Sequence, residues 1–316
     1  MIIRQRPNGL QLFFLYRGSI LQVIKLKLSI TILVASLVTL THGMFFHLKV
    51  TLTPIPFSIM AIALAIFLGF RNSASYDRYW EGRKLWGQLT IVSRDLARQV
   101  LSFISAREGQ NSTRPPLAPD DPRLRIIRRL IALAHSLRHH LRDSDPMADT
   151  YEFFDPEERT EFEKARNKPD FLLRRMAFDL RSSFDEQRTS EYFVARMDES
   201  LAGLASVIGG CERIKSTPIP YSYTLLLHRT AYLYCYLLPF GLVDSIGYMT
   251  PFVVGIVSYT FFGLDALGEE LEEPFNTASN SLPLTALCRS IERDLREAMG
   301  ESDLPEPLQP VDYCLL

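Results

Sequence analysis

The chain has 316 residues and a formal net charge of −1, with 47% hydrophobic and 22% charged residues. A near-neutral chain is not expected to bind nucleic acid, which needs a basic face. Its four cysteines form no C-x-x-C pair, so neither a disulfide framework nor a zinc site is expected.

Two apolar stretches, residues 28–48 and 50–70, have the length of a membrane-spanning helix, which needs about 20 apolar residues. The titratable residues of the first are His42 and His47. The second carries Pro54 and Pro56 near its start, where a helix loses least from a missing N–H group. We therefore predict that the two stretches form a helical hairpin in the membrane.

Basic residues flank this hairpin on one side. They precede the first stretch and follow the second, whereas the connection between the stretches holds only Lys49. Because Lys and Arg are retained on the cytoplasmic side, we predict a multi-pass protein of the inner (plasma) membrane with a cytoplasmic N-terminus. The flanking residues are Arg4, Arg6, Arg17, Lys25, Lys27, Arg71, Arg78, Arg83 and Lys84.

Residues 71–215 have a different pattern, in which arginines alternate with Leu and Ile at helical spacing. This predicts a cytoplasmic bundle of amphipathic helices. Residues 108–121 are rich in Pro, Ser, Thr and Asn and predict a surface loop. The apolar face after this loop is formed by Leu124, Ile127, Leu130, Ile131, Ala134, Leu137 and Leu141.

His135, His139 and His140 raise the question of a metal, because imidazoles at i and i+4 share one helix face. Arg138 and Arg142 are interleaved with them, and no carboxylate nearby in the sequence supplies a third ligand. The pattern favours a solvated helix face, and we predict no metal site.

A second pair of apolar segments, residues 221–242 and 245–264, predicts another membrane hairpin. His228 and Arg229 lie inside its first segment, and Asp244 lies between the two. The basic residues at 213 and 215 place the start of this hairpin in the cytoplasm. Helices over 265–300 and the C-terminus are therefore expected to be cytoplasmic as well.

The whole pattern predicts an all-α integral membrane protein, with about four transmembrane helices continuous with a cytoplasmic helical bundle. We expect residues 1–316 to form one integrated domain, ending in an extended or mobile tail at 301–316 that contains three prolines. The sequence has no phosphate loop, nucleophile elbow or paired acid motif. It is not expected to be an enzyme or to need a cofactor.

Three motifs stand at the cytoplasmic ends of the predicted membrane helices. In this order and approximate spacing they resemble the bestrophin family, above all its bacterial members, and the likeness extends to about residue 296 and is weakest over 107–188. The motif residues are Arg71, Asn72, Tyr76, Arg78, Tyr79, Trp80, Glu81, Gly82, Arg83, Leu85, Trp86 and Gly87; the runs 210–214 and 217–221; and the run 268–272 with Pro274 and Phe275.

The resemblance implies a homopentameric ion channel, in which the second membrane helix of each subunit surrounds a central pore. Ile62, Ile66 and Phe70 match the position of the family's apolar neck. They recur every four residues, so five copies would form three apolar rings. Such rings gate by excluding water. A lipid-embedded helix is apolar on every face, so periodicity alone does not select this stripe.

Further roles follow from the resemblance. Arg71 and Asn72 are expected to end the apolar pore and to face an aqueous vestibule. A second constriction is expected at Tyr192 or Phe193. Trp80 and Trp86 are expected to brace their helix against its neighbours, with anchoring at headgroup depth as the alternative. The expected structural motif consists of Trp80, Glu81, Gly82, Arg83, Trp86, Glu212, Arg213 and Pro274.

Animal bestrophins follow the Pro-Phe pair with an acidic run that binds calcium, whereas residues 276–281 of this chain contain no carboxylate. Calcium prefers about six to eight oxygen ligands, several of them charged, so calcium activation is not expected. The missing run resembles the bacterial branch, which is associated with monovalent cations such as sodium.

Cation conduction is therefore favoured, and an anion (chloride) channel of the same family is the alternative. A transporter or a non-conducting membrane scaffold remains open as a second alternative. The expected partners are further copies of the chain, monovalent ions and membrane lipids.

Overall fold

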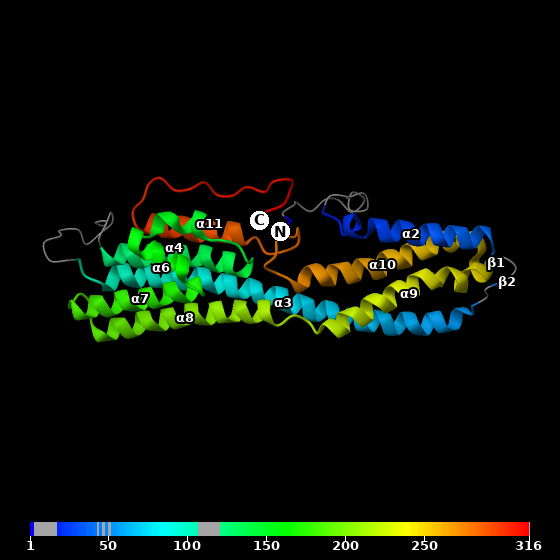
Figure 1. Cartoon of the computed structure of the whole chain (residues 1–316), viewed down its shortest axis with the longest axis horizontal. Helices are drawn as coiled ribbons and strands as arrows, with labels where there is room; N and C mark the ends of the chain where they lie inside the picture. Colours follow the sequence, from blue (N-terminus) through cyan, green and yellow to red (C-terminus); the bar gives the residue numbers. More distant parts are fainter. Residues whose placement is uncertain (3–17, 43, 46–47, 50–51, 107–120, 316) are drawn as a thin grey trace.

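The structure is a computed structural model, and it describes the chain except for residues 3–17, 43, 46–47, 50–51, 107–120 and 316. Figure 1 shows an elongated helical molecule in which one helix, α3 (Pro54–Phe103), extends through both ends. Two separate hydrophobic cores lie along this helix. The predicted all-α fold is confirmed; the strands among the described residues are β1 (Met44–Phe45) and β2 (Leu48–Lys49), which form a minimal antiparallel pair.

The membrane end consists of α2 (Leu21–Leu40), α9 (Tyr221–Ile246), α10 (Thr250–Glu272) and the first part of α3. Among the described residues, three stretches are long and apolar enough to cross a membrane, and the third, from 221 to 272, contains both α9 and α10. Helix α10 packs against the other three helices. Helices α2, α3, α9 and α10 therefore correspond to the four stretches predicted to cross a membrane, although their boundaries differ.

The first membrane helix was predicted at 28–48, and this range is wrong. Helix α2 already begins at Leu21, because Lys25 and Lys27 are accommodated in it; Lys27 Nζ lies 5.0 Å from the centroid of the Tyr232 ring. Long Lys side chains can carry their charge away from an apolar helix face. The helix ends at Leu40, after which His42 adopts a φ of 46°.

The second membrane helix begins at Pro54, as expected for proline at the first helical position. It does not end at 70 but continues to Phe103, so the whole helix has 50 residues. At 1.5 Å per residue, such a helix is about 75 Å long. The membrane core and the cytoplasmic core therefore share one uninterrupted helix.

The second hairpin also differs from the prediction. Asp244 lies inside α9 rather than between the two helices. The chain reverses at Gly247, which has a φ of 52°, and passes through the short 3-10 helix η2 (Gly247–Met249) into α10. Because α10 runs on to Glu272, the motif run 268–272 belongs to this helix.

The opposite end of the molecule is the helical bundle that was predicted to be cytoplasmic, and it surrounds the second half of α3 (Figure 1). Helix α4 packs against α3, α7, α8 and α11, so it is buried on most sides, including all the apolar positions predicted for it. The elements at this end are α4 (Pro122–Leu141), α5 (Met147–Thr150), η1 (Tyr151–Phe153), α6 (Pro156–Lys164), α7 (Lys168–Asp185), α8 (Glu191–Ser216) and α11 (Leu284–Ala298).

The histidines of α4 do not form the solvated face predicted for them. His135 is buried and lies 3.2 Å from Glu292 of α11. His139 lies 2.7 Å from Asp149, and His140 lies 3.0 Å from Glu212. The prediction failed because α4 is covered by neighbours on the side that its arginines and histidines face. Each imidazole is used in a different contact with a carboxylate.

Two further predictions concern connecting segments. The loop predicted at 108–121 lies outside the described residues up to 120, and so do the basic residues Arg4, Arg6 and Arg17. The described tail is extended, as predicted, and returns along α11 towards the N-terminus (Figure 1). Arg293 donates to the carbonyl of Pro305, and Cys314 pairs with Ile2 in an isolated bridge.

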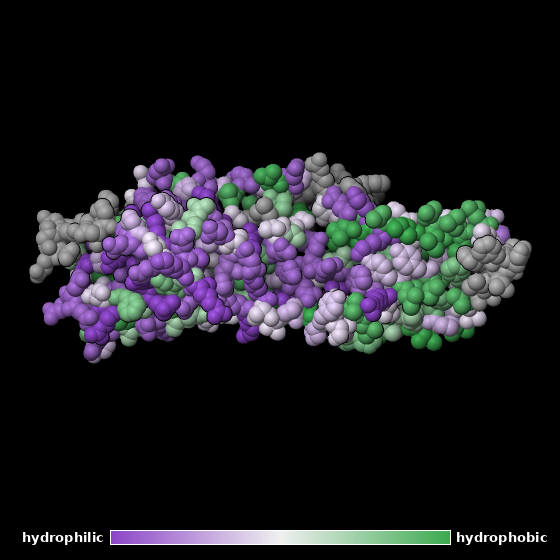
Figure 2. All heavy atoms as spheres, viewed as in Figure 1, coloured by the Kyte–Doolittle hydropathy of each residue, from purple (hydrophilic) through white to green (hydrophobic). Residues whose placement is uncertain are grey.

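The surface divides between the two ends. Figure 2 shows apolar residues gathered over α2, α9, α10 and the start of α3, and hydrophilic residues over the bundle at the opposite end. This division supports a membrane-embedded end and an aqueous end.

Candidate functional site

The described structure exposes the three neck candidates on one face of α3. Ile62, Ile66 and Phe70 are 65%, 51% and 64% exposed. The opposite face of the same turns is buried against the membrane core through Leu64 and Leu68. One subunit therefore leaves a stripe of large apolar side chains without cover; we call these three residues the neck stripe.

The same helical face changes character directly after Phe70. At helical spacing, Ser73, Asp77 and Lys84 continue it, and all three are exposed. Asp77 and Lys84 make no ion pair or hydrogen bond with any other described residue. Charged side chains without partners need water, so this face borders an aqueous space from Ser73 onwards.

Arg71 does not face that space, contrary to prediction. Its side chain is 2% exposed, and its guanidinium lies 2.5 Å from Asp265 and 3.7 Å from Glu272, both on α10. One residue advances a helix by about 100°, which turns position 71 away from Phe70 and towards the interior of the subunit. Arg71 therefore fastens α3 to α10.

Asp265 connects a third helix to this pair. His228 Nδ1 of α9 lies 2.8 Å from Asp265 Oδ2, whereas Arg71 contacts the other carboxylate oxygen, Oδ1. Glu272 in turn accepts a hydrogen bond of 3.1 Å from the backbone N–H of Ile219. The charges at the end of the membrane core that adjoins the bundle thus join α3, α9 and α10.

Asn72 is also turned towards α10. A Cβ added at Gly268 would lie only 2.6 Å from Asn72 Oδ1. The amide N and O of Asn72 are buried and have no hydrogen-bond partner among the described residues. The structure thus supports no pore-facing position for either predicted mouth residue in the isolated subunit.

The two tryptophans of the motif differ in position. Trp86 is fully buried in the cytoplasmic core, whereas Trp80 is 50% exposed. Burial of Trp86 fits the predicted bracing of α3 against its neighbours and not an anchor at headgroup depth. Trp80 remains available for contacts outside the subunit.

The remaining motif residues hold α3 to two other segments. Glu81 pairs with Arg213 of α8. Gly82 lies directly against Phe275, because an added Cβ would come within 3.0 Å of the Phe275 ring. Pro274 is buried and accepts a hydrogen bond of 2.8 Å from Leu282 N–H, while Arg83 is exposed. Glu212, on α8, accepts from Asn167 at 2.9 Å.

The residues predicted for a second constriction lie at the start of α8, far from the membrane end (Figure 1). Tyr192 is 77% exposed, whereas Phe193 stacks on Phe103 at 4.2 Å between ring centroids. Tyr192 is therefore the freer of the two for contacts outside the chain.

Asp265, His228 and Gly268 were not identified as site residues from the sequence. A signal was present for one of them: Asp265 is a lone carboxylate at the end of an apolar run, and Arg71 is a lone base at the end of another. Two such residues at the same membrane depth are natural partners, but sequence alone does not place the two helices together.

The comparisons with known proteins agree over nearly the full length. A family model described as Bacterial/Fungal Bestrophin protein matches residues 1–297. The chain is 41% identical over 312 residues to the voltage-dependent anion channel-forming protein YneE of Escherichia coli strain K12, covering 98% of each. It is also 41% identical over 313 residues to a voltage-dependent anion channel-forming protein of Mesorhizobium japonicum, covering 99% of this chain and 96% of that protein. A crystal structure of a bacterial bestrophin homologue from Klebsiella pneumoniae matches with a TM-score of 0.81 at 41% identity, covering 89% of this chain and 100% of that one.

Proposed function

This chain belongs to the bacterial and fungal bestrophin family of ion channels, and on that premise we propose that five copies surround one pore whose neck is built by Ile62, Ile66 and Phe70 of α3. The pore conducts small monovalent ions. The cytoplasmic parts of the five α3 helices continue it as a vestibule.

One observation carries this proposal: a single face of α3 is apolar and exposed up to Phe70 and polar and exposed from Ser73. Contact with lipid would also explain the apolar half of this face, so the membership of an ion-channel family is what favours a pore here. A pore explains both halves, because a narrow apolar section excludes water while the section beyond it is wet.

The conducted ion is either an anion or a cation, and one observation favours each. The related proteins from Escherichia coli and Mesorhizobium japonicum are named as anion channel-forming, which favours anions. Asp77 favours the cations predicted from the sequence, because it is the first charged residue on the neck face and has no partner among the described residues. Five such carboxylates near a pore axis would attract cations.

Recording from the purified protein in a planar bilayer tests conduction and ion sign together. Under a gradient of sodium chloride, a reversal potential near the sodium equilibrium value identifies a cation channel, and one near the chloride value identifies an anion channel. The mass of the detergent-solubilised particle measures the number of subunits. Pentamers that carry no current would instead support a scaffold, and a monomeric particle would contradict the shared pore.

We further propose that the helical bundle and both termini lie in the cytoplasm of a cell whose inner (plasma) membrane holds α2, α9, α10 and the start of α3. Lys25 and Lys27 in the first turns of α2 and the charged residues of α3 beyond Phe70 support this orientation. Cysteines introduced at Tyr192 and at Tyr248, at opposite ends of the molecule, would react with an impermeant thiol reagent from opposite sides.

Calcium is not expected to open this channel. The acidic side chains beside the Pro-Phe pair are engaged by amides: Asn276 donates to Glu273 at 3.0 Å, and Asn280 donates to Glu270. A carboxylate oxygen that accepts from an amide N–H is less available to a divalent cation, which prefers several charged oxygen ligands. Single-channel open probability should not change as calcium is raised through the micromolar range; a clear rise would contradict this expectation.

A further inference from the structure

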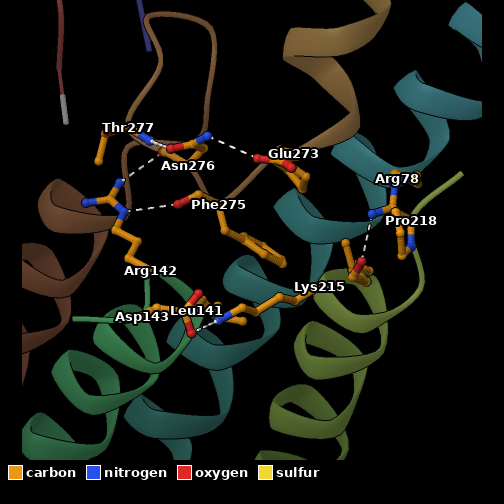
Figure 3. A pocket seen from close by; sticks show the side chains of 12 residues that line it. Arg78, Leu141, Arg142, Asp143, Lys215, Pro218, Glu273, Phe275, Asn276 and Thr277 are labelled. Carbon is orange, nitrogen blue, oxygen red and sulfur yellow. Dashed lines mark hydrogen bonds and ion pairs between the residues drawn. The ribbon is translucent and has the colours of Figure 1, made fainter. Parts of the chain in front are cut away.

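A pocket of about 400 Å³ lies where α3, the end of α4, the end of α8 and the loop after α10 meet. Figure 3 shows Arg142 reaching up to this loop, Lys215 beside Asp143 on the opposite side, and Arg78 on α3. With Glu273, the pocket contains three cationic and two anionic side chains. The side chains that line the pocket therefore carry a net positive charge.

Arg78 is held by carbonyl groups rather than by a carboxylate. Its Nε donates to Glu272 O at 3.0 Å, and its terminal nitrogens donate to Ile214 O at 2.7 Å and to Thr217 O. A guanidinium has five N–H donors, so donors remain after these three bonds. No carboxylate among the described residues forms an ion pair with it.

Arg142 has the same kind of environment. It donates to Phe275 O at 3.0 Å, to Thr285 Oγ1 at 3.1 Å and to Asn276 O at 3.4 Å. It too forms no ion pair with a described carboxylate. Burial, and next the charge of Arg138, lower the pKa of Arg142.

The two carboxylates of the pocket do not compensate these guanidinium groups. Asp143 is engaged with Lys215, whose Nζ lies 2.5 Å from it, and is 82% exposed. Glu273 accepts a hydrogen bond from Asn276. The guanidinium groups of Arg78 and Arg142 are thus both half-buried in this pocket, and both keep N–H groups that can donate further hydrogen bonds.

We propose that this pocket binds a phosphate group, with Arg78, Arg142 and Lys215 as its charged partners. Guanidinium groups present paired N–H donors that match the oxygens of a phosphate, and charge-assisted bonds of this kind are strong. The volume exceeds that of a single phosphate, so the group can carry an organic substituent.

The position of the pocket gives such a ligand a structural effect. It lies at the linker between α8 and α9, through Pro218, and at the loop between α10 and α11, through Phe275. These connections tie the membrane helices to the cytoplasmic bundle. A bound phosphate would join them to α3, which also carries the neck stripe.

Two sources can supply the phosphate group. A soluble phosphate compound can enter from the cytoplasm, and a phospholipid headgroup can reach the pocket because α9 begins at Tyr221, only a few residues beyond Pro218. Both offer the same charge and oxygen geometry, so the probes in the experiment distinguish them.

The first measurement is isothermal titration of inorganic phosphate into the full-length protein in detergent at low ionic strength. Saturable binding is expected for the wild type and for Arg181→Gln, a control that removes a 70% exposed cation of α7. Lys215→Gln and Arg142→Gln should weaken binding about tenfold or more. Asp143→Asn should instead strengthen it, because the carboxylate no longer competes for Lys215. A substitution at this exposed position should leave folding unchanged.

The second measurement uses phosphatidylcholine nanodiscs with and without phosphatidic acid. A rise in the thermal midpoint with phosphatidic acid that is present in the wild type and in Arg181→Gln, but absent in Lys215→Gln, identifies a lipid headgroup as the source. Binding of neither probe, or equal binding by control and pocket variants, overturns the proposal. These readouts do not depend on conduction, so they stand even if the channel is silent.

Discussion

Arg71 and Asp265 form a buried ion pair in the turn of α3 that follows Phe70, with a closest distance of 2.5 Å and side chains that are 2% and 4% exposed. The pair joins the helix of the neck stripe to α10. Removing one member of a buried pair leaves an uncompensated charge, whereas replacing both with apolar residues can be nearly neutral. This asymmetry makes the pair testable.

Asp265→Asn should destabilise the protein strongly, by about 3–5 kcal/mol, because Arg71 would keep its charge without a full partner. The loss should appear as a lower thermal midpoint of the purified oligomer. The double variant Arg71→Met/Asp265→Leu should recover much of the lost stability. Equal midpoints for the wild type and Asp265→Asn would mean that water or Glu272 already compensates Arg71.

Ile66→Ala should raise the open probability or the conductance, because a smaller side chain widens the neck and weakens its exclusion of water. The comparison is with Leu33→Ala on α2, which truncates an apolar side chain that is 60% exposed but lies on another helix. Single-channel recording measures the open probability and the conductance of each variant. A neck variant that behaves like the α2 control would remove Ile66 from the pore.

Trp86→Ala should reduce stability and the yield of intact oligomer, because Trp86 is fully buried in the cytoplasmic core. Truncating a buried aromatic side chain costs about 3–5 kcal/mol. Trp80→Ala removes the half-exposed tryptophan of the same motif and should cost less stability. Size-exclusion chromatography with thermal unfolding distinguishes the two, and a Trp86→Ala protein as stable as the wild type would contradict the bracing role.

Gly82→Ala should destabilise the protein by about 1–3 kcal/mol through overpacking. The new Cβ would lie 3.0 Å from Phe275 Cε1 and 3.4 Å from Leu282 Cδ1, so the loop after α10 would have to move. Gly209→Ala is the matched control, because that helical glycine has nothing within 4 Å of an added Cβ. It should be neutral or slightly stabilising, since alanine favours helix more than glycine does.

Acid should destabilise the contact between α4 and α11. Burial disfavours the charge of Glu292, but the hydrogen bond with His135 and the charges of His135, Arg296 and Arg289 outweigh it, so the pKa of Glu292 lies below its ordinary value of 4.5. A carboxyl group with a lowered folded-state pKa contributes stability above its ordinary pKa and loses it as the pH falls through the folded value.

The thermal midpoint should therefore fall as the pH is lowered from 4.5, and the fall should be smaller in Glu292→Gln. Asp149 contributes in the same direction: burial opposes its charge, but His139 and Arg138 hold its pKa below the ordinary 3.8. A pH profile of Glu292→Gln that matches the wild type would show that this carboxyl is not responsible.

The sequence predicted the helices because they depend on local patterns, whereas the resemblance to the bestrophin family, and not periodicity, selected the neck stripe. Apolar length identifies membrane helices, and spacing of four residues aligns Ile62, Ile66 and Phe70. Boundaries were less accurate where a charged residue belongs to an apolar helix, as Lys27 and Asp244 do. There, a partner or a long side chain compensates the charge, and the sequence does not show it.

Side-chain direction was predicted less well than position. Arg71 was expected to face an aqueous vestibule because of the resemblance, and His135 was expected on a solvated face because arginines are interleaved with the histidines in the sequence. Both are buried, since Asp265 and Glu292, each more than a hundred residues away, provide the opposing charge. Contacts of that kind depend on how helices pack, which a local pattern does not specify. The pentamer, the ion sign and the role of Tyr192 are predictions that recording and mass measurement will test.

The continuity of α3 restricts how this chain can vary in evolution. Because one inserted residue rotates everything beyond it by about 100°, an insertion between Phe70 and Trp86 would separate the angular setting of the neck stripe from that of the cytoplasmic core. Neither half could keep its partners, since Leu68 and Trp86 are both buried on fixed sides of the same helix. Insertions and deletions should therefore be tolerated in the loops of this family but excluded from this segment. The length of α3 sets the angular position of the neck stripe relative to the helical bundle.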